Sequence, residues 1–159
     1  MDIVDDDTSH PWLIPLKAKS KAFQYLRKWE LVREQETGLQ VGTYITDGGE
    51  LKLDKMTKWL ESQGTIHQLT APYTSAHIRQ VEQMHHTLIG KARTMKTYAN
   101  FPDFLWDELY LTAMHLTAKT ITCSLGDITP FKKWFNQKPD YSYIREIGCK
   151  AFLCSSSGN

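Results

Sequence analysis

The amino-acid sequence predicts an α/β domain in which helices flank a sheet, and two observations lead to that class. With 159 residues, of which 41% are hydrophobic and 23% charged, the chain is long enough to bury one core. Short β-branched and aromatic runs also alternate with stretches whose apolar residues recur every three or four positions. Such alternation of strand and helix signals is typical of layered α/β domains.

The first part of the chain is predicted to contain three strands separated by two helices. The strands are expected at residues 11–16, 39–46 and 65–70, and the helices from Ser20 to Glu36 and from Leu53 to the stop at Gly64. Glycines end both helices, and prolines border the first strand, where their missing amide donors do least harm. This arrangement delivers Asp47 to the carboxyl end of the second strand.

The second part is predicted to be mostly helical. A long helix carries an inward apolar stripe at steps of three and four, formed by Val81, Met84, Leu88, Ala92 and Met95. Glu82 lies about 100° round the helix from Val81, so the helix can aim a carboxylate past its packed face. A helix over residues 101–120, a short helix over 128–135 and a closing strand over 149–154 complete the expected order.

Charge and cysteine content narrow the class of protein. The net charge of +1 gives no argument for a nucleic-acid, membrane or acidic partner, and the acidic run at 2–7 and the basic run at 17–28 are interpreted as solvated faces. The cysteines, Cys123, Cys149 and Cys154, lack a two-residue spacing, so buried free thiols are expected rather than disulfides or a zinc knuckle. Neither a secretory signal nor a membrane-spanning stretch is found, which predicts an intracellular protein.

Asp47 and Glu82 are the candidate catalytic and metal-binding residues. Carboxylates at a strand end and on a helix can converge on one point, and their oxygens suit Mg²⁺ or Mn²⁺ better than zinc. Nucleotidyl transfer by two metals needs about three or four carboxylate oxygens to hold both ions. Because Asp-Gly and Gly-Gly are common turn signals, a plain turn at Asp47 is the alternative that spacing alone leaves open.

Several motifs resemble those of one known family, in order and in spacing. The stretches "TDGGE" at 46–50, "GTIHQLTAPYT" at 64–74 and "HTL" at 86–88 are similar to S-D-N-G-G-E, G-I-I-H-Q-x-T-x-P-Y-T and E-R-K-N-R-T-L. "FLWDE" and "TPFKKWFNQKPDYSYIREIGCKAF" resemble F-W-A-E and T-P-Y-E-x-W-x-x-K-P-x-x-x-x-L-R-x-F-G-C-x-A-Y. On these residues the chain resembles a copia-type retrotransposon integrase catalytic domain, of the retroviral integrase superfamily.

This resemblance implies an RNase H-like mixed sheet flanked by helices. Residues 1–100 would form a partial catalytic core, and residues 101–159 the C-terminal helices and closing strand of the same domain. Asp47 and Glu82 match the second and third acids of the family's triad, which cuts DNA ends and joins them to target DNA with Mg²⁺ or Mn²⁺. Gly48 and Gly49 would then let the backbone turn sharply beside a metal ligand.

The first acid of the triad has no clear match. "VDDDTSHPWLIPLKAKSKAF" resembles the family's second and third strands, whereas the first acid lies on a preceding strand in a D-x-x-G-P context. Asp5 and Asp6 do not match that context, and Asp2 is followed by too few residues to make the intervening hairpin. We therefore expect the first, central strand of the sheet to be missing, together with the family's upstream zinc-binding segment.

Other departures reduce the expected affinity for DNA. The asparagine between Asp47 and Gly48 is deleted, and Gln83, Met84, His85 and His86 replace the basic R-K-N-R run after the glutamate. Lost phosphate contacts weaken DNA binding, so the ancestral partner, DNA, is expected to bind weakly. A homo-oligomer or a polyprotein context is a further expectation, with the nucleus as location if the chain still acts on DNA.

The function expected is that of a fragment of a retrotransposon integrase core, inactive as this chain. The alternative is a non-catalytic interaction module that reuses the fold. Glu82, His85 and His86 also have the spacing of a helical transition-metal site, but a second such motif is absent. His67, His77 and His115 are interpreted as ordinary polar or packed histidines, and Cys149 as a core cysteine rather than a nucleophile.

Overall fold

The computed structural model describes residues 1–46, 54–69 and 76–152, and the chain divides into two compact units. Unit 1 comprises Met1–His86 and unit 2 comprises Thr87–Asn159. Helix α3 (Ala76–Ala99) runs through this boundary, while the division of one domain after residue 100 stays a prediction. Small sheets and five α-helices among the described residues confirm the α/β class.

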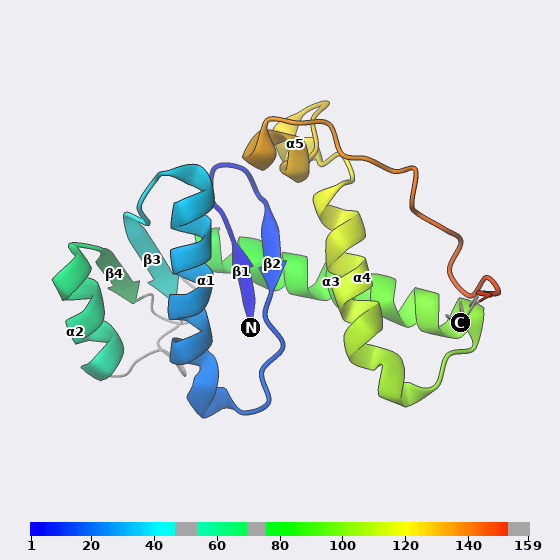
Figure 1. The fold of residues 1–159 in the computed structure, drawn as a ribbon, viewed down its shortest axis with the longest axis horizontal. Coiled ribbons are helices and arrows are strands. Elements are labelled where there is room, and N and C mark those ends of the chain that lie inside the picture. Colours follow the sequence, from blue (N-terminus) through cyan, green and yellow to red (C-terminus); the bar gives the residue numbers. More distant parts are fainter. Residues whose placement is uncertain (47–53, 70–75, 153–159) are drawn as a thin grey trace, which may run out of the picture. The chain divides into compact units, whose positions relative to one another are not determined.

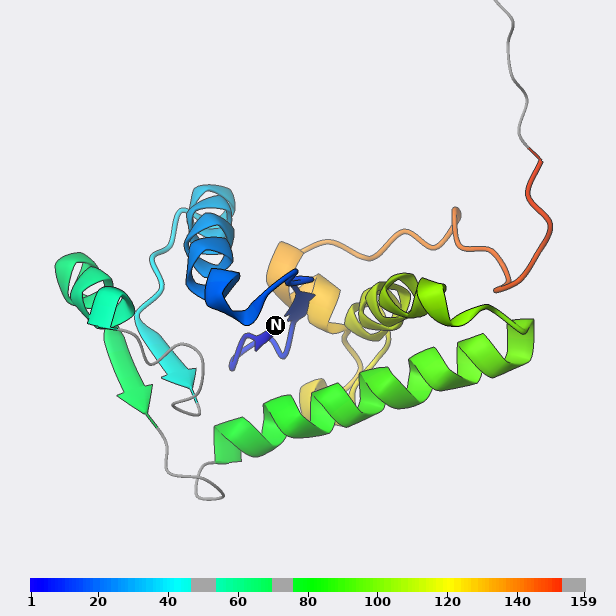
Figure 2. The same cartoon turned by 90° about the horizontal axis from the view of Figure 1, so that it is seen from below.

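Unit 1 contains two separate two-stranded ladders. Strands β1 (Asp2–Val4) and β2 (Pro11–Leu13) pair antiparallel, with Ile3 opposite Trp12. Strands β3 (Thr43–Thr46) and β4 (Ile66–Leu69) pair parallel and lie side by side in Figures 1 and 2. The sequence predicts one mixed sheet, but in the described part of the chain no ladder joins the two pairs.

Two helices connect the strands of unit 1 as the sequence predicts. The short 3₁₀ helix η1 (Lys19–Lys21) leads into α1 (Ala22–Thr37), which joins β2 to β3. Gly38 ends α1 in the left-handed region, with φ of 69°, and its N–H donates to the Glu34 carbonyl at 2.8 Å. Helix α2 (Asp54–Gln63) precedes β4, and both helices lie on the same face of the β3–β4 pair (Figure 2).

The core of unit 1 lies between these helices and the strands. Leu26 from α1, Met56 and Leu60 from α2, and Tyr44 from β3 are buried together, and half-buried aromatic side chains such as Trp29 and Trp59 surround them. The Tyr44 hydroxyl donates a hydrogen bond to the buried Glu30 carboxyl group on α1. Burial raises the pKa of Glu30, and the hydrogen bond from Tyr44 opposes that rise.

Unit 2 is built around the second half of α3 and the helix that follows it. After the 3₁₀ turn η2 (Asp103–Leu105), α4 (Trp106–Ala118) packs its apolar face inward; the buried apolar side chains of unit 2 are Leu88, Ala92, Leu109, Tyr110, Ala113, Ala118 and Pro130. A 3₁₀ turn, η3 (Cys123–Leu125), precedes α5 (Pro130–Phe135). The Thr129 side chain caps α5 by accepting from the Lys132 N–H at 3.1 Å. No helix of the described residues has the length and apolar character needed to cross a membrane.

The predicted closing strand is wrong over residues 149–152, which have no strand structure, while residues 153 and 154 lie outside the described part. The tail segment, defined as residues 136–152, is instead attached to helices by side-chain hydrogen bonds. The Tyr141 hydroxyl donates to the Lys119 carbonyl at 2.7 Å, and Tyr98 donates to the Glu146 carboxylate at 2.8 Å. These contacts hold the backbone without a ladder partner.

The cysteine prediction also needs correction. Cys123 and Cys149 are free thiols, as expected, but both are exposed, because Cys123 lies on the surface turn η3 and Cys149 in the irregular tail segment. Cys149 is therefore not the core cysteine that its apolar neighbours indicated. Cys154 lies outside the described residues.

Leu60→Ala tests the core of unit 1. Because Leu60 is 1% exposed and packs against Tyr44 and Met56, its truncation should lower the free energy of unfolding by about 2 to 5 kcal/mol. Urea unfolding followed by circular dichroism measures this loss. Leu31→Ala, on an α1 side chain that is 58% exposed, is the control and should change stability by no more than about 0.5 kcal/mol.

Gly148→Ala tests how the tail segment attaches to α3. Gly148 has φ of +81°, and a Cβ there would lie 2.8 Å from the Cβ of Ala99, so both strain and a clash oppose the substitution. We expect faster trypsin cleavage after Arg145 and Lys150 than in the unaltered chain. Gly126→Ala is the matched control, because Gly126 has φ of +66° but no heavy atom within 4 Å of the added Cβ. Equal cleavage rates in the two variants would mean that the close approach to Ala99 does not hold the tail.

Candidate functional site

The carboxyl ends of β3 and β4 mark the edge where the first candidate acid is expected. Because the strands are parallel, their last residues, Thr46 and Leu69, face the same edge of the ladder. The Thr46 hydroxyl and Nε2 of His67 lie 2.9 Å apart, which links the two strands one residue before Asp47. Burial lowers the pKa of His67, which disfavours the protonated form of its imidazole. Asp47 itself lies outside the described residues, as do Gly48 and Gly49.

Glu82 is exposed on α3, at the border of its packed face as predicted. Two contacts on either side of it hold α3 against the β1–β2 hairpin. Nε2 of Gln80 donates to the Ser9 hydroxyl at 3.3 Å, and Nδ1 of His85 lies 2.7 Å from the Asp2 carboxylate. These contacts hold the helix that carries Glu82, but because Asp47 is not described, the convergence of the two carboxylates stays a prediction.

The acids near the N-terminus have structural partners. The Asp5 carboxylate accepts from the Thr8 N–H at 2.8 Å and from the Thr8 hydroxyl at 2.6 Å, so it closes the turn between β1 and β2. The Asp2 carboxylate lies 2.7 Å from Nδ1 of His85, whose side chain is 51% exposed. Neither acid could therefore serve as the first acid that the resemblance implies without giving up a contact that shapes unit 1.

A transition-metal site on α3 is not assembled by the described residues, which contain no group of three or more metal-binding side chains. His85 is engaged by Asp2 instead. Two of the histidines interpreted as ordinary are polar contacts, since His67 bonds Thr46 and Nε2 of His115 lies 2.6 Å from the Tyr143 hydroxyl. The side chain of His77 lies outside the described part.

Sequence reasoning did not single out His10, which the structure buries in the hairpin turn. Its ring lies 4.5 Å from that of Trp12, and burial is the main cause that lowers its pKa to about 4, against an opposing effect of Asp5. No sequence signal marks this histidine, because its burial depends on how the turn from Asp5 to His10 folds back over β2.

Comparison of the sequence with known proteins indicates which proteins the chain is related to. No family model matches the chain. Over 150 residues, or 94% of the chain, it is 31% identical to the retrovirus-related Pol polyprotein from transposon TNT 1-94 of Nicotiana tabacum. The Pol polyproteins from transposons RE1 and RE2 of Arabidopsis thaliana match the same share of the chain at 27% and 28% identity. The chain is homologous to a segment of copia-type Pol polyproteins.

This homology confirms the retrotransposon origin that the motifs predict. The chain spans 11% of the length of the tobacco polyprotein and 10% of each Arabidopsis polyprotein, about a tenth of the relatives it matches. Because so small a share is covered, the activities of those whole proteins are not thereby activities of this chain.

The chain should lose stability in acid because its buried His10 resists protonation. The pKa of His10 is about 4 in the folded chain, whereas an ordinary histidine, as in the unfolded chain, has a pKa of 6.5. Between pH 4 and pH 6.5 the unfolded chain therefore binds a proton that the folded chain does not. The free energy of unfolding should therefore fall as pH drops from 6.5 to 4, by up to about 3 kcal/mol.

Urea unfolding at pH 7 and pH 4.5 measures this loss. His10→Asn should reduce the difference between the two pH values, whereas His86→Asn, on an exposed α3 side chain, should leave it as large as in the unaltered chain. A His10→Asn variant with unchanged pH dependence would show that other groups cause the acid sensitivity.

Proposed function

We propose that this chain is an incomplete integrase catalytic core of RNase H-like ancestry. The fold of that ancestor carried out metal-dependent polynucleotidyl transfer on DNA. The observation that carries the proposal is the parallel β3–β4 pair. It ends at the residue before Asp47, and the chain after β4 leads into α3, which bears Glu82. The motif order and the Pol homology support the same assignment.

The break between the two ladders supports the proposed ancestry. In the RNase H-like sheet of the family that the chain resembles, the first strand lies between the second and the fourth. The second and fourth strands correspond here to β1 and β3. The described residues pair β1 with β2 and β3 with β4, and no strand lies between them in the ladders. An RNase H-like sheet without its central strand would separate into these same two pairs.

The residues present fit a hard divalent cation, though with few ligands. Asp47 and Glu82 would hold it through carboxylate oxygens, the ligand type that Mg²⁺ and Mn²⁺ prefer. When bound, such an ion would stabilise the charge that develops on the reacting phosphate. Two carboxylates replace fewer of the tightly held waters than three, so we propose weak metal binding and no strand transfer by this chain.

A segment that supplies the central strand should complete both the sheet and the site. We expect a version of the chain extended upstream by a family-type strand with the missing aspartate to melt at higher temperature and to bind Mn²⁺ more tightly. Each buried backbone group left unpaired costs about 1 to 3 kcal/mol, against a typical total stability of about 5 to 15 kcal/mol. Thermal melting by circular dichroism and isothermal titration with Mn²⁺ measure the two effects.

Substitutions in the extended version separate the metal site from the fold. Asp47→Asn and Glu82→Gln should each weaken Mn²⁺ binding by at least about tenfold, a loss of about 1.4 kcal/mol, while leaving the melting temperature nearly unchanged. Glu61→Gln, on an exposed acid of α2, is the control and should bind Mn²⁺ as before. If the extension alters neither melting nor Mn²⁺ affinity, the proposed ancestry of the sheet is wrong.

A non-catalytic interaction module is the second candidate, and the ladders themselves favour it. Within the described residues β1 and β3 each pair on one side only, and an unpaired strand edge can accept a strand from another protein or a second copy. A homo-oligomer or a polyprotein neighbour would then complete the sheet. This candidate needs neither the metal nor DNA, although the ancestral action of the core on DNA would place it in the nucleus.

A further inference from the structure

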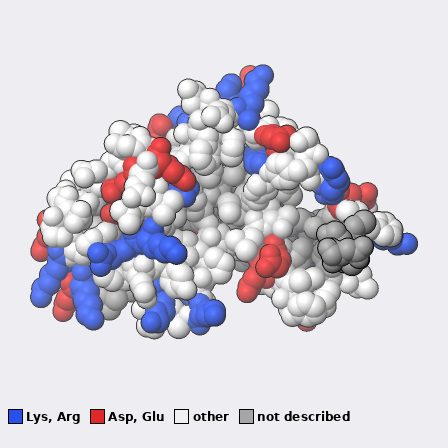
Figure 3. All heavy atoms as spheres, viewed as in Figure 1, with Lys and Arg blue, Asp and Glu red and all other residues white. Residues whose placement is uncertain are grey.

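One surface of unit 1, formed by η1, the first half of α1 and α2, carries an excess of positive charge. Its exposed lysines, which we call the basic surface, are Lys17, Lys19, Lys21, Lys28, Lys55 and Lys58. In Figure 3, Lys and Arg side chains gather at the lower left of the view, where Figure 1 draws α2 and the start of α1. Residues 8–29 contain no aspartate or glutamate, although the whole chain has a net charge of only +1.

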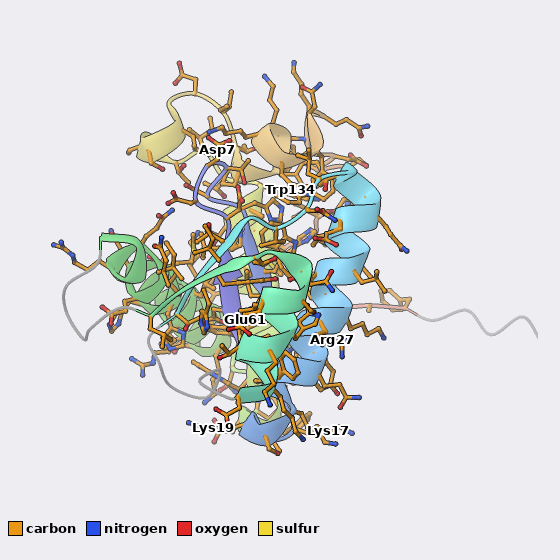
Figure 4. The ribbon with its side chains drawn as sticks, turned by 90° about the vertical axis from the view of Figure 1, so that its left-hand side faces the viewer. Asp7, Lys17, Lys19, Arg27, Glu61 and Trp134 are labelled. Carbon is orange, nitrogen blue, oxygen red and sulfur yellow. The ribbon has the colours of Figure 1, made fainter. Side chains whose placement is uncertain are left out.

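Contacts between α1 and α2 place these lysines on one continuous surface. The Phe23 and Trp59 rings lie 5.4 Å apart, and the Arg27 guanidinium lies 6.0 Å from the first ring centroid and 5.5 Å from the second. Figure 4 shows Lys17 and Lys19 near the start of α1. Because Arg27 lies over both rings and its charge also acts on the buried Glu30, we do not count that arginine among the binding groups.

The stability of α1 does not explain the lysines at its start. A helix favours acidic residues in its first turn and basic residues in its last, because its N-terminus carries partial positive charge. Helix α1 has no acidic residue in its first turn and no basic residue in its last, while Lys19 and Lys21 immediately precede it. No carboxylate of the described residues forms an ion pair with Lys17, Lys21 or Lys28. These exposed charges are therefore available to an external anion.

We propose that the basic surface binds the phosphate backbone of double-stranded DNA. This inference rests on the proposed function, since an integrase core acts on DNA. Lysine ammonium groups are flexible point charges, which contact phosphates without reading base sequence. The proposed contact lies on α1 and α2, whereas the basic residues that the chain has lost in comparison with the family lie on α3. Some affinity for DNA is thus retained on a different part of unit 1.

The chemistry of the surface favours a duplex over the other anionic partners. A single strand would need several exposed ring faces on which bases stack, but the rings of Phe23 and Trp59 are half-buried beneath Arg27, which leaves Tyr25 as the one exposed ring within residues 17–28. An acidic protein would need an apolar anchor at the centre of the interface. Within residues 17–28, all of which are described, Tyr25 is the only exposed large hydrophobic residue, at 37%.

Fluorescence anisotropy with a labelled duplex of arbitrary sequence tests the proposal. The measurement uses the full chain, contains a metal chelator, and is repeated at several salt concentrations. Lys17→Gln, Lys21→Gln and Lys28→Gln combined should weaken binding at about 50 mM salt by at least about tenfold. The slope of log K against log salt should fall by about 1 for each lysine that contacts phosphate.

Two matched variants and a competitor make the result specific. Replacing the same three lysines by arginine keeps the charges and should keep the affinity and the salt slope. Removing three exposed charges from unit 2, with Arg93→Gln, Lys138→Gln and Lys150→Gln, should leave binding unchanged. Poly-glutamate at equal charge concentration should not displace the duplex.

Several outcomes would overturn the proposal. Equal loss in the unit 2 variant would mean that net charge, not this surface, binds DNA, and effective competition by poly-glutamate would indicate an acidic protein partner. Unchanged affinity in the glutamine variant, or no duplex binding by the unaltered chain, would also refute it. Because the chelator removes divalent metal, none of these results depends on the metal site, whose Mn²⁺ titration tests the proposed function separately.

Discussion

The parallel pairing of β3 with β4 is the constraint on which the rest of unit 1 depends. Parallel strands need a crossover connection, and α2 lies on that crossover, where it places Met56 and Leu60 against Tyr44. The same pairing directs the carboxyl ends of both strands, at Thr46 and Leu69, to one edge of the ladder. A core contact and the common direction of two strand ends are thus consequences of one ladder.

The hydrogen bond between Tyr44 and Glu30 ties this ladder to α1. Burial raises the pKa of Tyr44 and that of Glu30, so each group resists ionisation more than it would in water. A buried carboxyl group without a donor would be costly, and the tyrosine hydroxyl reduces that cost only while α1 lies against β3. The polar pair therefore specifies which part of α1 faces the strand, a specificity that the apolar side chains around it do not supply.

Local sequence signals predicted the helices well and the strands less well. The apolar repeats located α1, α2 and α3, and the glycine stops marked the ends of α1 and α2, because both signals act within a few residues of chain. Local signals missed strand β1, although the resemblance implied a strand there, because β1 has three residues and its pairing depends on a turn closed by the Asp5 side chain. The prediction of a closing strand failed for the opposite reason, since an apolar run predicted a ladder where tyrosine side chains attach the tail to helices.

The exposure of Glu82 was predictable from helical geometry. The shared surface of the α1 and α2 lysines was not, because it depends on the packing of Phe23 on Trp59.

The contacts of the N-terminal acids limit how the proposed site can be completed. Asp2 is the only acid of β1, and its carboxylate is paired with His85, one helical turn from Glu82. If Asp2 turned to a metal instead, α3 would lose one of the polar contacts that hold it against the hairpin, and Glu82 would lose part of its support. Asp5 has the same conflict, because its carboxylate closes the turn that presents Ser9 to Gln80. A third metal ligand is therefore better supplied by a strand between β1 and β3 than by either acid, since such a strand would add a carboxylate and leave both contacts in place.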